Sequence, residues 1–458
     1  MPPDSPPPDR SASEPSSSAS DAASSSPLAL THGRVLALAW PVVLAQVATA
    51  MTSVVDTAVM GRVGGKVDLA AVGVAAVSFS FIYWAFGFLR MSTTGLVAQA
   101  QGAGDAIAVR AHLMRALLTG AVLGVVIVAA ARPLESVAMA SFDAAADVET
   151  LARGYVRARI WGAPAALMGY AVTGWLLGTG RTRQLLAFQI VLNASNAGLD
   201  AWFAGVLHWG PAGIGAGTAM AEWISLGFGL VLVRRSLGWP EQLFDRGALV
   251  ALFAANRDIL VRTLALLFSF AWFVNSGAQA GTAALAGNEI LLQFISVSAF
   301  VLDAFAFVAE KEIGEAVGMR SLERFRGAMT TTTQLAFGFG VAFSVVFVVS
   351  GPAIIDGLVS DAEARAVAQE FLPYCVLVPV IGVPAWQLDG AFLGATQGRA
   401  LRNAAVLAMG IYVAIDFTLA PRFGNTGVWI ALLSMYVARA GALGLHWRSL
   451  VGAVRQPK

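Results

Sequence analysis

The stretch Val35-Leu-Ala-Leu-Ala-Trp-Pro-Val-Val-Leu-Ala-Gln-Val-Ala-Thr-Ala-Met-Thr-Ser-Val-Val55 has 21 residues and no charged side chain. A transmembrane helix needs about 20 consecutive apolar residues to cross the hydrocarbon of a bilayer. Uncharged runs of the same length recur from Leu69 to Leu89, from Ile160 to Gly180 and from Ala201 to Ala221. This repeated pattern predicts a membrane protein that crosses the bilayer many times.

The composition agrees with this prediction. Of the 458 residues, 57% are hydrophobic and only 13% are charged, whereas a soluble domain carries about 25% charged residues. The single cysteine, Cys375, excludes a disulfide framework and a cysteine metal site. No Gly-rich phosphate loop ending in Lys-Ser or Lys-Thr is present, so we do not expect an ATP-driven pump. We expect no enzyme activity, no cofactor and no metal centre of the His/Cys type.

The charged residues and the Gly and Pro residues divide the chain into segments of spanning length. Extending the apolar runs past single charges predicts an all-α integral membrane protein with twelve helices, at approximately 34–61, 67–100, 107–132, 148–179, 182–207, 211–235, 248–281, 283–310, 319–351, 362–396, 400–420 and 425–450.

The distribution of basic residues predicts the orientation. With these twelve helices, 22 of the 30 Lys and Arg residues fall on the side that holds both termini. Because basic loops stay on the cytoplasmic side, we expect both termini in the cytoplasm and the protein in the inner (plasma) membrane. Residues 1–30 are rich in Ser, Pro, Ala and Asp without an apolar run, and we expect a disordered cytoplasmic tail there.

An internal duplication indicates two halves. Gly174-Trp-Leu-Leu-Gly178 recurs 216 residues later as Gly390-Ala-Phe-Leu-Gly394, and an aspartate follows each copy by 22 residues, at Asp200 and Asp416. These echoes predict two pseudo-symmetric six-helix lobes, at residues 31–240 (helices 1–6) and 241–458 (helices 7–12). Transporters with such repeats hold their substrate between the halves and alternate access by rocking them.

Polar residues inside the predicted spans are candidates for function, because a carboxylate at bilayer depth costs at least a few kcal/mol. Asp56 lies in the first helix. Asn196 and Asp200 are four residues apart in the fifth helix and therefore share one face. Thr218 lies in the sixth helix, which a short loop makes an antiparallel neighbour of the fifth. Such a group could bind and release a proton, or its oxygens could bind Na⁺ at Asp56, Asn196 and Asp200.

The acids of the second half allow several interpretations. Asp416 matches Asp200 in the repeat, but Tyr412 replaces the amide that Asn196 provides in the first half. Asp389 and Glu289 could bind cationic substrate, pair with arginine or stabilise packing. Arg157 and Arg159, near the outer end of the fourth helix, are expected to extend toward the headgroups.

Several motifs resemble the multidrug and toxic compound extrusion family, in particular its DNA-damage-inducible protein F-like branch. Pro41 precedes the aspartate of Val55-Asp-Thr-Ala-Val-Met-Gly61 by fifteen residues, and the stretch from Phe86 to Asp105 is similar to the second-helix signature of that branch. Val274-Asn-Ser-Gly-Ala-Gln-Ala-Gly281 and Leu388-Asp-Gly390 extend the resemblance into the second half.

The resemblance implies an exporter that exchanges organic, often cationic, small molecules for H⁺ or Na⁺ without a cofactor. Carried over by position, its cation site consists of Asp56, Asn196, Asp200, Tyr155, Thr173 and Thr218, with Thr173 standing where some relatives have an amide. Asp389 is displaced from the acid of the Na⁺-coupled branch, which favours H⁺. We expect a monomer whose only partners are its substrates and the lipid bilayer, with no nucleic acid.

The mechanism that we predict from these features combines the carboxylates with a bend of the first helix. Pro41 removes a backbone donor there, so protonation of Asp56 and Asp200 could shift or bend the helix as the lobes rock. Two alternatives remain open. A lipid-linked precursor flippase has the same two-lobe build but calls for an Arg-rich groove, and a channel would not account for the duplication and the buried acids.

Overall fold

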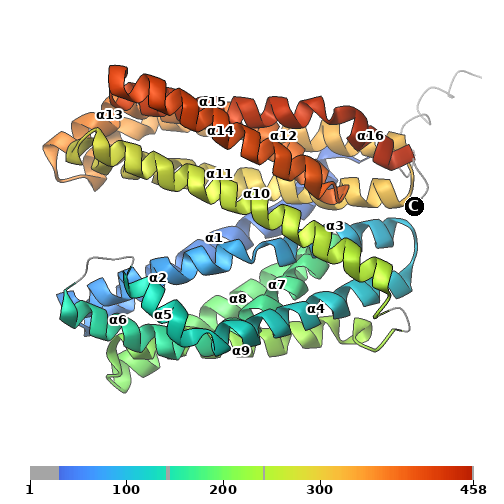
Figure 1. Ribbon diagram of the computed structural model, residues 1–458, viewed down its shortest axis with the longest axis horizontal. Helices are drawn as coiled ribbons and strands as arrows, with labels where there is room; N and C mark the ends of the chain where they lie inside the picture. Colours follow the sequence, from blue (N-terminus) through green and yellow to red (C-terminus); the bar gives the residue numbers. More distant parts are fainter. Residues whose placement is uncertain (1–29, 141–144, 241–242, 456–458) are drawn as a thin grey trace, which may run out of the picture.

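The computed structural model describes residues 30–140, 145–240 and 243–455, and these residues form helices and no strand (Figure 1). The predicted tail, except for Leu30, lies outside the described residues. The first half contains α1 (His32–Val63), α2 (Lys66–Ala85), α3 (Phe88–Gly102), α4 (Ala106–Ala129), α5 (Ala131–Ala140), α6 (Ala146–Arg159), the 3₁₀ turn η1 (Ile160–Gly162), α7 (Ala163–Gly178), α8 (Thr182–Asp200), the π-helical segment η2 (Ala201–Val206), α9 (Gly210–Val233) and the 3₁₀ turn η3 (Arg234–Ser236). The second half contains α10 (Arg246–Gln279), α11 (Thr282–Gly318), α12 (Leu322–Leu358), α13 (Ala362–Gly394), α14 (Gly398–Phe423), α15 (Asn425–Leu445) and α16 (Trp447–Arg455).

The prediction of an all-α membrane fold is confirmed. Among the described residues, 11 helical segments are long and apolar enough to cross a membrane, and α2 with α3, and α6 with α7, each count as one such segment. The remaining predicted span corresponds to α8 and η2. It has spanning length, but Gln189, Asn193, Asn196 and Asp200 make it more polar than the others.

The structure corrects the end of the eighth predicted helix. The sequence predicts this end at residue 310, with Lys311 in the following loop, but α11 continues to Gly318 and Lys311 is buried within it. The reason is local charge pairing: Lys311 Nζ donates to Glu312 at 2.9 Å and to Glu315 at 2.6 Å, and Arg324 also binds both acids. Because the two basic and two acidic side chains neutralise one another, Lys311 can stay buried and the helix can continue past it.

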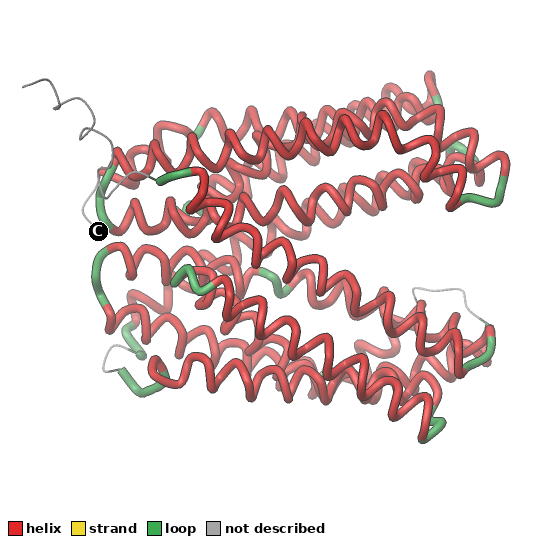
Figure 2. Tube along the Cα trace, turned by 180° about the vertical axis from the view of Figure 1, so that it is seen from behind, coloured by secondary structure: helices red, strands yellow, loops and turns green. Residues whose placement is uncertain are grey.

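The helices form two bundles that diverge toward one end of the molecule and meet at the other, where α16 lies (Figures 1 and 2). Helices α1 to α9 form the N bundle, and α10 to α16 form the C bundle. This grouping supports our division into lobes, although that division stays a prediction, and residues 241–242 lie outside the described part of the chain.

Close packing joins the bundles at the end where they meet. A Cβ atom at Gly102 of α3 would lie only 2.1 Å from the carbonyl oxygen of Glu315 in α11. Gln99 Nε2 of α3 donates to the carbonyl oxygen of Gly394 at 2.7 Å, and Arg90 lies 3.6 Å from Glu310. The absence of a side chain at Gly102 thus allows the two backbones to touch.

Helix α12 of the C bundle exposes a run of apolar side chains. On α12, Val345, Val346, Val348 and Val349 are all exposed, and Val349 retains 74% of its accessible surface. In water such a continuous apolar surface would favour association, whereas lipid chains solvate it without cost. This surface therefore agrees with a helix that faces the bilayer.

Glu135 of α5, outside the candidate spans, provides a test of local stability. Hydrogen bonds from Arg157 and Arg153 hold the pKa of Glu135 below its ordinary value of 4.5. The pair therefore stabilises the folded protein above pH 4.5, and this contribution is lost as the pH falls through the lower pKa of the folded state.

We expect Glu135→Gln to lower the apparent Tm in detergent by about 1–2 °C at pH 7, a small effect because the arginines are solvated. The Tm difference between the variant and the wild-type protein should shrink as the pH falls below 4.5 and disappear below the lower pKa of Glu135 in the folded protein. Glu370→Gln, at an exposed position of α13, serves as the control. An unchanged Tm difference at acid pH would contradict the charge-pair explanation.

Candidate cation-coupling site

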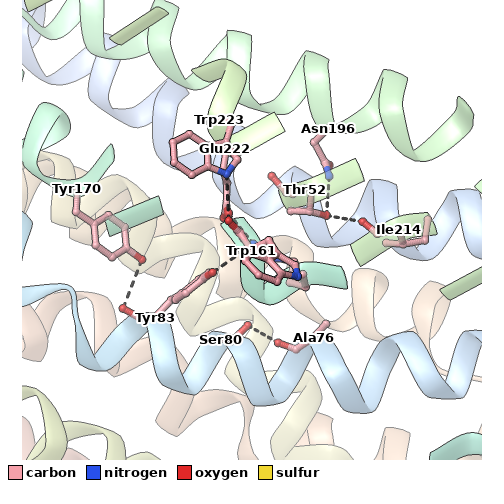
Figure 3. Close-up of polar contacts among 12 residues, drawn as sticks. Thr52, Ala76, Ser80, Tyr83, Trp161, Tyr170, Asn196, Ile214, Glu222 and Trp223 are labelled. Atoms are coloured by element: carbon pink, nitrogen blue, oxygen red, sulfur yellow. Dashed lines mark hydrogen bonds and ion pairs between the residues drawn. The ribbon is translucent and has the colours of Figure 1, made fainter. Parts of the chain in front are cut away.

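Three helices of the N bundle bring the predicted polar residues together. Asn196 Nδ2 of α8 donates to Asp200 Oδ2 at 3.0 Å and to Thr218 Oγ1 of α9 at 3.0 Å. Thr218 in turn donates to the carbonyl oxygen of Ile214 at 2.9 Å. Figure 3 shows Asn196 beside Ile214 among the helices of this bundle. The spacing of Asn196 and Asp200 by one helical turn therefore produces the shared face that we predicted.

The carboxyl group of Asp56 in α1 completes the cluster. Asp200 and Asn196 are its polar neighbours. Asp56 is 6% exposed, and Asp200 and Asn196 are fully buried. Among the described residues, neither Asp56 Oδ1 nor Asp200 Oδ1 has a hydrogen-bond donor. Two carboxyl groups in contact cannot both carry full charge at low cost, so this arrangement is suited to sharing a proton.

The hydrogen-bonding pattern of the backbone changes next to Asp200. The α-helical hydrogen bonding of α8 ends at Asp200, and the π-helical segment η2 follows it directly. Single π-helical turns are rare and often lie at functional sites. In addition, a Cβ atom at Gly217 would lie 2.2 Å from Asp200 Oδ1, so only glycine leaves room for the carboxyl group.

The resemblance contributed two further residues, and the structure treats them differently. Tyr155 of α6 is 2% exposed and lies within electrostatic range of both Asp56 and Asp200. Thr173 of α7 is half-buried and makes none of the hydrogen bonds of this cluster among the described residues. The geometry thus includes Tyr155 in the site and leaves Thr173 outside it.

A polar seam between α1 and α8, which the sequence analysis missed, leads away from the acid pair. Thr52 Oγ1 donates to Asn193 Oδ1, and Gln189 Nε2 donates to Thr49 Oγ1 at 2.7 Å. The signal was available: Thr49 and Thr52 precede Asp56 at intervals of three and four residues, which places all three on one helix face. The seam fixes α1 against α8.

The expectation for Arg159 was wrong. Its side chain does not extend to the headgroups but is buried inside the N bundle, where it binds Glu222 of α9 through two hydrogen bonds of 2.6 and 2.7 Å. Arg157, two residues earlier on the opposite face of α6, is exposed and binds Glu135. Glu222 was also missed, although it is an acid in an otherwise apolar helix, the same signal that identified Asp56.

The predicted acids Asp416 and Asp389 of the C bundle bind different partners. Asp416 Oδ2 accepts hydrogen bonds from Ser276 Oγ at 2.7 Å and from Trp272 Nε1 at 2.8 Å. Asp389 binds two arginines, Arg262 and Arg439.

Glu289 of α11 is exposed. The adjacent Asn288 instead carries the buried contacts, to Asn425 at 2.7 Å and to the indole nitrogen of Trp429 at 2.8 Å. Of the roles predicted for Asp389 and Glu289, the structure shows pairing with arginine for Asp389.

Pro41 lies inside α1, which continues on both sides of it. Because proline has no N–H, the carbonyl oxygen of Ala37 receives no helical hydrogen bond at this point. A helix weakened there can bend at low cost. Whether Pro41 serves as a bend stays a prediction.

The family model MatE matches residues 41–202 and 259–418. DNA damage-inducible protein F of Escherichia coli (strain K12) is 33% identical over 417 residues, which cover 90% of this chain and 91% of that protein. The chain belongs to the MatE family. It is therefore a membrane transporter with many membrane-spanning helices, and not an enzyme.

More distant relatives agree with this assignment. Protein DETOXIFICATION 44, chloroplastic, of Arabidopsis thaliana is 26% identical, with 93% of this chain and 85% of that protein covered. Among solved structures, an outward-facing multidrug resistance MATE family transporter of the MOP superfamily superimposes with a TM-score of 0.84 at 18% identity, covering 94% of this chain and 98% of that one. The bent form of the Vibrio cholerae MATE transporter VcmN gives a TM-score of 0.82 at 18% identity, covering 92% and 97%. These structures show the shared fold.

Within the described ranges, no group of three or more His, Cys, Asp or Glu residues could hold a metal ion. The acid pair with Asn196 and Thr218 offers oxygen atoms that would suit Na⁺, and its hydrogen-bond geometry also suits H⁺. The oxygen atoms and the hydrogen bonds of this site thus suit either coupling ion.

Proposed function

We propose that this protein exports organic, mainly cationic, compounds in exchange for protons bound at Asp56 and Asp200. The observation that carries the proposal is the contact between these two buried carboxyl groups, supported by Asn196. With one proton the pair is stabilised by a hydrogen bond between the acids, and without it two negative charges repel each other in a poorly solvated interior. Proton binding and release therefore change the forces between α1 and α8.

The arrangement of the bundles supports alternating access by rocking. The bundles meet at one end and diverge toward the other, as expected of one of two alternating states. We propose that the closed end faces the cytoplasm with both termini, in the inner (plasma) membrane, and that the protein functions as a monomer. Protonation from outside would let α1 bend near Pro41, release the substrate and permit the opposite state.

A cavity between the bundles supports an amphipathic organic substrate. Its volume is about 410 Å³, in the range of drug-sized sites. It is lined by Leu36, Ala39, Trp40 and Val43 of α1 and by Val301, Phe305, Phe339 and Phe343 of α11 and α12. Aromatic rings attract organic cations as well as apolar groups. A flippase for lipid-linked pyrophosphates is less well supported, because Arg262 and Arg439 are already bound to Asp389.

Transport by purified protein in liposomes tests the proposal. A fluorescent lipophilic cation should accumulate when a proton gradient is imposed and should not respond to a sodium gradient at constant pH. Accumulation that follows only the sodium gradient would assign the same oxygen atoms to Na⁺ and overturn the proton proposal. Passive flux that responds to neither gradient would indicate a channel.

A further inference from the structure

The buried ion pair between Arg159 and Glu222 lies beside the coupling site and has no part in the mechanism described so far. Two parallel N–H···O bonds of 2.6 and 2.7 Å join the guanidinium group to the carboxylate. The side chains of both residues retain less than a tenth of their accessible surface. A bidentate pair of this kind fixes the orientation of both groups.

Two aromatic rings and a glycine pack closely against the pair. The Arg159 guanidinium lies over the rings of Tyr83 and Phe79 of α2, at 5.0 and 5.4 Å from their centroids, and Nη1 is 3.3 Å from the Tyr83 hydroxyl. A Cβ atom at Gly162 would lie 2.1 Å from a Glu222 carboxylate oxygen. Figure 3 shows Glu222 between the helix that carries Tyr83 and the one that carries Asn196. The pair thus connects α2, α6 and α9.

The register of the helices links the pair to the coupling site. Arg159 follows Tyr155 by four residues on α6, and Glu222 follows Thr218 by four residues on α9, so each lies one turn from a residue of the site. The Arg159 charge is within electrostatic range of both Asp56 and Asp200. The titratable and charged groups that face this region are Asp56 of α1, Tyr83 of α2, Tyr155 and Arg159 of α6, Tyr170 of α7, Asp200 of α8 and Glu222 of α9.

We propose that Arg159 and Glu222 are positioning residues of the coupling site. Their bond holds Tyr155 and Thr218 against the acid pair, and the guanidinium charge sets the pH at which Asp56 and Asp200 exchange a proton. The negative charge of Glu222 partly cancels the positive charge of Arg159. Without Glu222, Arg159 would drive the proton off Asp56 and Asp200 completely. This inference rests on the proposed proton coupling.

The pH dependence of gradient-driven transport tests the inference, because a residue with only a structural role would change the rate and not the pH midpoint. Glu222→Gln leaves the guanidinium charge unbalanced, so the midpoint should move to lower pH by roughly one unit. In the double variant Arg159→Gln/Glu222→Gln the nearby positive charge is absent, and the midpoint should move to higher pH. We therefore expect the two variants to move the pH midpoint of transport in opposite directions.

Two further variants complete the design. Arg159→Lys keeps the charge and loses the two-pronged bond, so it should slow transport several-fold without moving the midpoint, and it remains informative if the double variant does not fold. Arg157→Gln, on the opposite face of α6, is the matched control and should leave both quantities unchanged. Midpoints that stay at the wild-type value, or that move in the same direction in both charge variants, would overturn the inference. If the wild-type protein shows no proton-driven transport at all, the proposed function fails instead.

Discussion

Replacing Asp200 by Asn is expected to abolish proton-driven transport, reducing it to the level of protein-free liposomes. Asn keeps the size and can still accept the hydrogen bond from Asn196, but it cannot bind and release a proton. Asp56→Asn should have the same effect because the two carboxyl groups act as one unit. The measurement is accumulation of a fluorescent lipophilic cation in liposomes under an imposed pH gradient.

The controls for this prediction separate loss of coupling from loss of structure. Asp356→Asn removes a carboxylate that is 53% exposed near the end of α12, and its transport should match that of the wild-type protein. Asp200→Glu keeps a titratable group but must fit beside Gly217, so we expect slower transport that still depends on pH. Wild-type transport in both Asp56→Asn and Asp200→Asn would rule out the acid pair as the coupling site.

The second large effect is expected at the contact between the bundles. In Gly102→Val, a Cβ atom would overlap the Glu315 carbonyl group, and relief of that overlap requires α3 and α11 to separate. Overpacking costs about 1–3 kcal/mol, which shifts a two-state equilibrium by roughly 5- to 150-fold toward the state in which this end is open. Transport, which needs both states, should fall by roughly 5-fold or more.

Cysteine labelling reports the shift directly. Cys375→Ser removes the only native cysteine, and Gln99→Cys introduces one at the contact, where Gln99 is 7% exposed. A maleimide should label this cysteine several-fold faster when Gly102→Val is present. Gly410→Val, at a position with no atom within 4 Å of the added Cβ, is the matched control. Unchanged labelling together with full transport in Gly102→Val would contradict a role for this contact in alternating access.

The membrane-spanning fold and the grouping of Asn196, Asp200 and Thr218 could be predicted from the sequence. Long apolar runs define membrane spans almost by themselves, because the hydrocarbon requires every backbone group to be bonded within the helix. Asn196, Asp200 and Thr218 could be grouped from helical spacing and a short loop. Tyr155 could not, since its placement depends on how α6 packs against α9, and only the family resemblance indicated it.

The parts that were missed share a physical cause. Arg159 and Lys311 were assigned to membrane surfaces because a lone charge is costly in the interior, but each has an acidic partner that lowers this cost. For Lys311 the partners Glu312 and Glu315 are close in sequence. For Arg159 the partner Glu222 is 63 residues away, and only the fold brings them together. A charged residue inside a span therefore calls for a search for its partner across the whole chain.

Proton release from the purified protein tests the central claim most directly. In weakly buffered detergent solution, a saturating organic cation should displace protons from the wild-type protein. Asp56→Asn and Asp200→Asn should release none at a cation concentration that a direct binding measurement shows to saturate each variant. Release from Asp200→Asn equal to that of the wild-type protein would show that substrate and proton do not compete through this acid pair, and would contradict the mechanism.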